Sequence, residues 1–145
     1  MHILMCNDDG ILADGLRHLA SYLSQYYRIT VVAPANEQSA KSHALTTEIP
    51  LKLDAYNGED ENPRLYALTG TPSDCMKFGL SYLLTDDMPD LVISGINHGF
   101  NLGSDVLYSG TVSAAMESGF YGIPGLALSV ERYSVERGDE MHPFI

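Results

Sequence analysis

Four short, oxygen-bearing side chains stand in comparable places in the sequence, each a few residues after an apolar run. They are Asp8, Asp9, Ser39 and Asn97. If those runs are parallel strands, their carboxyl ends lie along one edge of a sheet, where ligands of α/β folds bind. The set offers carboxylate, hydroxyl and amide oxygens but no Cys or His, so Mg²⁺, Mn²⁺ or Ca²⁺ suits it better than zinc or copper. We expect the four side chains to hold a divalent metal ion at this edge.

The segment Ser109-Gly110-Thr111 is typical of a helix start that can bind an anion. Free backbone N–H groups and the positive end of the helix dipole attract anions at such a position. Gly110 would let the backbone approach the anion closely. The alternative is that a hydroxyl caps the helix while the glycine serves packing. A metal at the neighbouring strand end favours the phosphate interpretation.

Each candidate metal ligand also has a purely structural interpretation. Asp8 and Asp9 can form a turn that caps the next helix, and Ser39 can make ordinary loop hydrogen bonds. Asn97 stands close to glycines and can simply tolerate a left-handed turn. The functional interpretation therefore depends on the placement of all four residues at successive strand ends. Because the sequence has no P-loop, GxGxxG or GxSxG motif, the usual signals for NTPases, dinucleotide-binding proteins and serine hydrolases are missing.

The elements that must position these residues are those of an α/β fold with a parallel sheet. Buried strands are expected over four runs, at 3–6, 29–33, 91–94 and 126–130. Helices are expected after the first run, from Thr71 and from Thr111. A strand, helix, strand order implies parallel pairing through a right-handed crossover. We expect residues 95–103, which are rich in glycine, to form the exit loop of the third run.

Two segments do not fit the simple alternation of strands and helices. Residues 34–50 are polar and irregular, and they are too long for an ordinary connection, which predicts a functional loop. Residues 51–68 are expected to form short strands around an exposed turn at 57–62.

Composition narrows the range of functions. The net charge of −11 repels phosphate backbones, which argues against nucleic-acid binding. No apolar run approaches the length of a membrane span, and no signal peptide is visible. The two cysteines, Cys6 and Cys75, have neither metal-site spacing nor a disulfide framework, so we interpret them as thiols in a reducing cytoplasm. A phosphate substrate would need a local positive charge, which a bound cation can supply.

The motifs in this order resemble those of one family, the SurE survival proteins. The matching segments are 7–10, 33–34 together with Ser39, 70–75, 89–97, 101–103 and 108–112. They span nearly the whole chain, and the stretch 89–112 is the most specific. The resemblance implies a Rossmann-like three-layer α/β fold with a mostly parallel central sheet, and the activity of a cytoplasmic nucleotidase.

The resemblance also implies roles for single residues. It implies that Asp8, Asp9, Ser39 and Asn97 hold one Mg²⁺ or Mn²⁺ per subunit, with Ca²⁺ as an alternative in a crystal. The implied activity is hydrolysis of nucleoside 5′- and 3′-monophosphates to nucleoside and phosphate, with some action on polyphosphate. We assign Asp8, Asp9 and Asn97 to catalysis, and Ser109, Gly110 and Thr111 to the phosphate.

The resemblance further bears on domain organisation. We expect residues 1–145 to form a single SurE-like nucleotidase domain that lacks the family's C-terminal oligomerisation segment; complete members form dimers or tetramers. Two residues depart from the family pattern. Ala35 stands where Asp is common, and Ala40 follows Ser39 where Gly is usual. Both departures fall in the loop expected beside the metal.

Two chemical routes and two other classes of protein stay open at this point. The metal can orient or deprotonate an attacking water, or Asp8 can attack phosphorus directly. A nucleotide-binding module without turnover is one alternative, because the departures in the loop can abolish catalysis. A phospho-acceptor receiver domain also places an acid pair after its first strand, but it needs a lysine after a late strand. The last lysine here is Lys77, well before the final strand.

Overall fold

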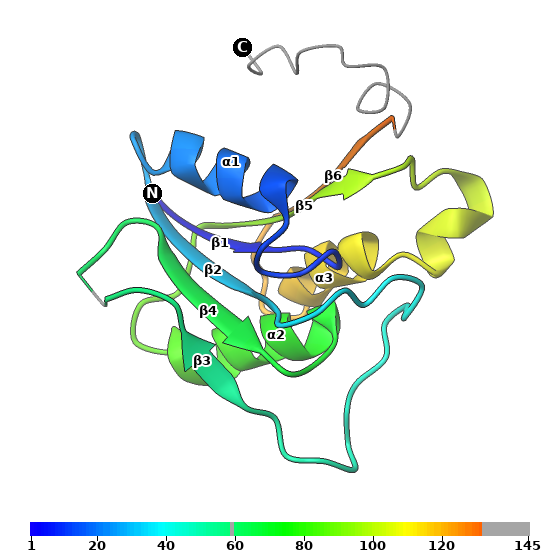
Figure 1. Cartoon of the computed structure of the whole chain (residues 1–145), viewed down its shortest axis with the longest axis horizontal. Coiled ribbons are helices and arrows are strands. Elements are labelled where there is room, and N and C mark those ends of the chain that lie inside the picture. Colours follow the sequence, from blue (N-terminus) through cyan, green and yellow to red (C-terminus); the bar gives the residue numbers. More distant parts are fainter. Residues whose placement is uncertain (59, 132–145) are drawn as a thin grey trace.

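The computed structural model describes residues 1–58 and 60–131, which form a six-stranded sheet flanked by helices (Figure 1). The strands are β1 His2–Cys6, β2 Arg28–Pro34, β3 Leu53–Ala55, β4 Arg64–Leu68, β5 Leu91–His98 and β6 Gly125–Val130. The α-helices are α1 Asp14–Leu23, α2 Pro72–Phe78 and α3 Gly110–Gly119. Two short helical turns complete the list, the π-helical η1 Gly79–Leu83 and the 3₁₀-helical η2 Gly103–Leu107.

The sheet is mostly parallel, as the sequence predicts. Its strand order is β3-β4-β2-β1-β5-β6, and only β3 runs antiparallel to its neighbour. From β1 the chain proceeds to β2 on one side, whereas β5 and β6 lie on the other side of β1. The strand order therefore reverses beside β1, and at such a switch point the loops diverge and leave a crevice at the carboxyl ends.

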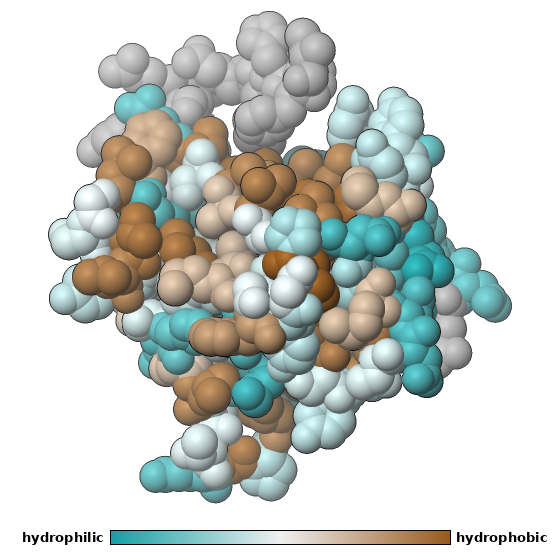
Figure 2. Space-filling model, turned by 180° about the vertical axis from the view of Figure 1, so that it is seen from behind, coloured by the Kyte–Doolittle hydropathy of each residue, from teal (hydrophilic) through white to brown (hydrophobic). Residues whose placement is uncertain are grey.

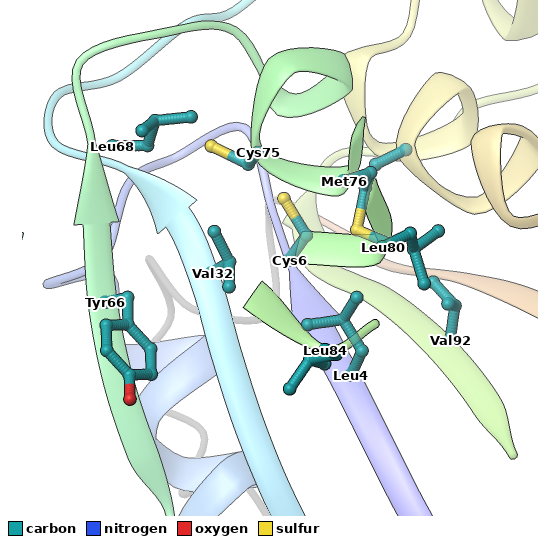
Figure 3. Packing of buried hydrophobic residues seen from close by; sticks show 11 residues of the cluster. Leu4, Cys6, Val32, Tyr66, Leu68, Cys75, Met76, Leu80, Leu84 and Val92 are labelled. Carbon is teal, nitrogen blue, oxygen red and sulfur yellow. The ribbon is translucent and has the colours of Figure 1, made fainter. Parts of the chain in front are cut away.

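Successive side chains of a strand point to opposite faces of the sheet, and the apolar ones form two cores, one on each face. Ile3 and Met5 face α1 and pack with Leu16 and Ala20 of that helix. Leu4 of the same strand points the opposite way, into the core that Figure 3 shows between the strands and α2. That second core also includes Ala114 of α3, so α1 covers one face of the sheet while α2 and α3 cover the other (Figure 1).

The helix expected from Thr71 begins there but is shorter than its apolar spacing suggests. The side chain of Thr71 accepts a hydrogen bond from the amide of Asp74, and the Asp74 carboxylate accepts one from the amide of Thr71, which is a capping box. The α-helix ends at Phe78 and continues as the π-helical turn η1. Gly79 marks this change: its helix propensity is low, and a Cβ there would lie 3.2 Å from the Leu4 side chain.

The third predicted strand is longer than expected, and its exit loop begins later. β5 continues through Gly95 to His98, with a register shift against β6 between Ser94 and Asn97. Gly95 has a φ of 124°, and a Cβ there would lie 2.3 Å from the carbonyl oxygen of Leu128 on β6. Glycine thus allows an irregularity that keeps the strand paired, so the prediction of a loop from residue 95 is wrong.

The remaining predicted elements are present. β3 and β4 are the short strands expected around an exposed turn, residue 59 of which lies outside the described residues. Residues 35–52, between β2 and β3, contain neither helix nor strand. No helix within residues 1–58 and 60–131 is both long enough and apolar enough to cross a membrane.

Candidate active site

A rigid turn after β1 presents Asp8 and Asp9. Asn7 is fully buried, and its side chain both donates a hydrogen bond to the carbonyl oxygen of Gly10 and accepts one from the Gly10 amide. Gly10 has a φ of 102°, a conformation that suits glycine. The turn is anchored to β2 because the amide of Ile11 donates to the carbonyl oxygen of Pro34. The two acids are therefore held at the switch point of the sheet.

The Asp8 carboxylate lies against the N-terminus of α3. Its exposed fraction is only 5%, and its Oδ1 accepts a hydrogen bond of 2.6 Å from the Thr111 hydroxyl. A Cβ at Gly110 would lie 2.9 Å from the Asp8 Cβ, so only glycine permits this approach. The positive end of the helix dipole stabilises a carboxylate in this position. The structure thus brings together two groups of candidates, Asp8 from the metal set and Gly110 and Thr111 from the phosphate set.

The backbone brings the loop that carries Ser39 to the same place. The amide of Gln38 donates a hydrogen bond of 2.7 Å to the carbonyl oxygen of Asp8. The neighbouring Ser39 is exposed, and its hydroxyl donates to the Glu37 carboxylate at 2.6 Å. That bond uses the hydroxyl hydrogen and leaves the lone pairs of the oxygen for a metal ion.

Asn97 lies at the carboxyl end of β5, the strand beside β1. It belongs to the strand itself rather than to a loop beyond it, because the register shift described above keeps it paired with Ser129. Its side chain is half-buried, and its amide nitrogen donates to the carbonyl oxygen of Gly99 at 2.8 Å. The amide oxygen, which carries the lone pairs of the side chain, is the atom that can bind a cation.

The donor set at this edge fits a hard cation. Of the two carboxylate oxygens of Asp8, Oδ1 accepts the hydrogen bond from Thr111. Oδ2 accepts none from the described residues and is therefore available to bind a cation. With Asp9, Ser39 and Asn97 it makes a set of oxygen donors, as Mg²⁺, Mn²⁺ and Ca²⁺ require. Within the described part of the chain, no group of three or more His, Cys, Asp and Glu side chains is placed to hold a metal.

The start of α3 confirms the capping interpretation, whereas phosphate binding there stays a prediction. The Ser109 hydroxyl accepts a hydrogen bond from the amide of Val112 and is therefore a helix cap. The amides of Gly110 and Thr111 precede the first intrahelical bond, which the Ser113 amide makes to Ser109. These two N–H groups point out of the helix start beside Asp8 and can donate to an anion.

Sequence reasoning missed two carboxylates that hold the loop after β2. Asp74 accepts hydrogen bonds from both the amide and the hydroxyl of Thr46. Glu117 of α3 contacts the ring of His43, with 2.6 Å between Nε2 and Oε2. The capping box that includes Asp74 is visible in the sequence, but nothing in the sequence links either acid to a loop tens of residues away.

A separate hollow of about 770 Å³ lies at the opposite edge of the sheet. It is lined by the amino ends of the strands, including His2, Arg28 and Arg64, and by Asp87. Arg28 and Asp87 already form an ion pair there. None of the candidate site residues lines this hollow, so it adds nothing to the site at the carboxyl ends.

The fold and the site together define a class: a doubly wound, parallel α/β domain whose acidic pair and helix N-terminus meet at the switch point. Comparison with known proteins makes the assignment specific. A family model described as "Survival protein SurE" matches residues 3–144. This chain belongs to the SurE family.

Individual relatives agree with the assignment. The chain is 54% identical over 129 residues to a protein named 5′-nucleotidase SurE from Thermoanaerobacter sp. (strain X514), a match that covers 89% of this chain and 50% of that protein. It is 49% identical over 144 residues to the protein of the same name from Caldanaerobacter subterraneus subsp. tengcongensis, covering 99% and 56%. The chain thus spans about half the length of the curated relatives it matches.

A solved structure confirms the fold. The SurE protein from Aquifex aeolicus superimposes with a TM-score of 0.78 at 43% sequence identity. The superposition covers 89% of this chain and 50% of that one. The predicted three-layer α/β architecture and the predicted family are therefore both confirmed.

Proposed function

We propose that this domain is a metal-dependent phosphomonoesterase that hydrolyses nucleoside 5′- and 3′-monophosphates to nucleoside and phosphate. The observation that carries the proposal is the buried Asp8 carboxylate, which is held by Thr111 against the N-terminus of α3. The carboxyl end of β1 thus offers oxygen ligands for a cation, and the adjoining start of α3 offers N–H groups for an anion. The relatives at about 50% identity bear the name 5′-nucleotidase SurE, which supports the same reaction.

In this proposal each residue has a defined task. Asp8, Asp9, Ser39 and Asn97 hold one Mg²⁺ or Mn²⁺, which when bound would polarise the phosphoryl group and activate water. The amides of Gly110 and Thr111 bind phosphate oxygens and stabilise charge that develops on them. The Thr111 hydroxyl fixes the orientation of the Asp8 carboxylate. Direct attack by Asp8 on phosphorus is the alternative route.

Further properties belong to the same proposal. We propose some action on polyphosphate, whose terminal group presents the same chemistry. We also propose a homodimer or homotetramer, because several large apolar side chains on η2, on α3 and its C-cap, and on β6 are exposed, namely Leu107, Met116, Phe120 and Leu126. Figure 2 shows that apolar surface is extensive on one face of the molecule. A cytoplasmic location agrees with the two free thiols.

Release of inorganic phosphate tests the proposed function. The chain is mixed with AMP, GMP, 3′-AMP or polyphosphate, each with Mg²⁺, Mn²⁺ or EDTA. We expect turnover of the monophosphates with metal, no turnover with EDTA, and a loss of about a hundred-fold or more in Asp8→Asn. The exposed Asp86→Asn is the matched control and should retain full activity.

Two outcomes would count against this function. Full activity in Asp8→Asn, with circular dichroism showing an unchanged fold, would remove the site from this edge of the sheet. Binding of AMP without phosphate release under any metal would instead identify a nucleotide-binding module without turnover.

A further inference from the structure

Part of the loop after β2 is fastened to the helical layer along its length. We call residues 39–46 the strap. Near its start, the amide of Ser42 donates to the carbonyl oxygen of Tyr108 at 3.1 Å, and the Ser42 hydroxyl donates to that of Leu107 at 2.7 Å. These contacts lie immediately before the cap residue of α3. The strap therefore runs close to the proposed phosphate donors.

The backbone of the strap is held in an unfavourable conformation. Ala40 and Ser42 have φ values of 57° and 54°, in the left-handed region that costs energy for any residue with a Cβ. Such residues persist only where surrounding contacts enforce them. Since Ala40 follows Ser39 directly, the contacts that enforce this turn restrict the position of Ser39 from one side, and the bond from Gln38 to Asp8 restricts it from the other.

A buried carboxylate supplies one of these contacts. Glu117 is 5% exposed, and within the described residues its side chain has one hydrogen-bond partner, His43 of the strap. Nε2 of His43 lies 2.6 Å from Oε2 of Glu117. A buried carboxylate without a partner is strongly unfavourable, so Glu117 holds the histidine, and with it the strap, against α3.

A second buried carboxylate fastens the far end of the strap. Asp74 accepts hydrogen bonds from the Thr46 amide at 3.0 Å and from the Thr46 hydroxyl at 2.7 Å. The Thr71 hydroxyl donates to the carbonyl oxygen of Ala44 at 2.6 Å. This end is fixed to the start of α2, whereas His43 fixes the middle to α3.

We propose that His43 and Glu117 form a positioning pair, which holds the strained turn of the strap and thereby places Ser39 beside Asp8. The proposal rests on the proposed function, in which Ser39 is a metal ligand. His43 acts through Ser39 and contacts neither the metal nor the substrate. Its removal releases the turn, so that Ser39 no longer stays within reach of the cation.

A double-mutant cycle read by Mn²⁺ binding tests this proposal. The affinity of the chain for Mn²⁺ alone is measured by calorimetry. We expect His43→Ala to weaken binding about ten-fold, as loss of an outer contact to a metal site does, and Ser39→Ala, which removes a ligand, to weaken it at least as much. The double variant should bind like Ser39→Ala alone, because a residue that acts through Ser39 has no effect once Ser39 is gone. His43→Gln keeps an N–H donor for Glu117 and should restore most of the affinity.

Amide hydrogen exchange separates this proposal from the proposed function. The amides of Ser42 and Thr46 should exchange at least ten-fold faster in His43→Ala than in the unmodified chain, with or without metal. The exposed His18→Ala on α1 is the matched control and should change neither exchange nor Mn²⁺ affinity.

If the unmodified chain binds no Mn²⁺ and releases no phosphate, the proposed function fails, and the exchange rates still decide whether His43 holds the strap. Unchanged exchange in His43→Ala, or additive losses in the cycle, would overturn the positioning pair.

Discussion

At the scale of single residues, the contact between Thr111 and Asp8 decides what the site can do. The hydroxyl of Thr111 is fully buried and donates to Oδ1 of a carboxylate that is itself almost inaccessible. Hydrogen bonds to a charged group contribute about 1.5–3 kcal/mol. The bond therefore both stabilises the buried charge and restricts the orientation of the carboxylate.

We predict that Thr111→Val lowers kcat/KM for a nucleoside monophosphate by about ten- to a hundred-fold, because Asp8 loses the group that orients it. The two side chains have similar shapes, so the loss of folding stability should be limited to about 1–3 kcal/mol. Thr111→Ser keeps the hydroxyl and should stay within a few-fold of the unmodified chain. Steady-state kinetics and urea unfolding measure both effects. Equal kcat/KM values for the Val and Ser variants would show that this contact is not used.

At the scale of elements, the site depends on how closely α3 approaches the end of β1. Gly110 lies at the contact, where a Cβ would meet both the Asp8 Cβ at 2.9 Å and the Pro72 side chain at 3.1 Å. Gly119 closes the same helix with open space around it. The two glycines thus form a matched pair on one helix, one beside the site and one remote from it.

Gly110→Ala should lower phosphate release by at least ten-fold and cost about 1–3 kcal/mol of folding stability, because the new methyl group separates α3 from Asp8. Gly119→Ala adds the same methyl group and should leave activity unchanged. Phosphate release and urea unfolding are measured for both variants. The account of the helix contact is wrong if the two substitutions have equal effects on activity.

The sequence predicted elements well where local patterns determine them. The apolar side chains of β1 and β2 point alternately into the two cores. Ser109 caps α3, as its residue type suggests. β5 was predicted too short because Gly95 resembles a loop residue locally. Its actual role depends on Leu128, whose carbonyl oxygen needs the space that a Cβ would take.

The candidate site was only partly predictable for the same reason. Strand ends indicated where Asp8 and Asn97 would lie, because the edge of a parallel sheet follows from the order of its elements. The pairing of His43 with Glu117 joins residues 74 positions apart and leaves no periodic signal. Contacts of this kind arise only when two packed layers meet, so they needed the folded structure.

At the scale of the whole molecule, charge sets the conditions for function. A chain with a net charge of −11 repels a phosphate ester at long range. In the proposed function the cation and the N-terminus of α3 would reverse this sign locally, at the switch point of the sheet. The opposite edge carries charges that pair among themselves, such as Arg28 with Asp87.

That opposite edge gives the fold a pH dependence. His2 is 2% exposed, and burial, together with the nearby Arg28 guanidinium, lowers its pKa below the ordinary value. Below about pH 6.5 the unfolded chain therefore binds a proton that the folded chain does not, and stability is lost as pH falls. We predict that the free energy of unfolding in urea decreases from pH 7.5 to 5.5 and that His2→Gln reduces this slope. The exposed His18→Gln should retain it; identical slopes in all three proteins would contradict the prediction.

The central claim is that Asp8, Asp9, Ser39 and Asn97 share one cation at the carboxyl ends of β1 and β5. Anomalous diffraction from a crystal soaked in Mn²⁺ tests it most directly, since the ion identifies its own ligands. The account predicts one strong peak with oxygens of these side chains at about 2.0–2.6 Å. A peak bound elsewhere, with no metal near Asp8, would contradict this claim.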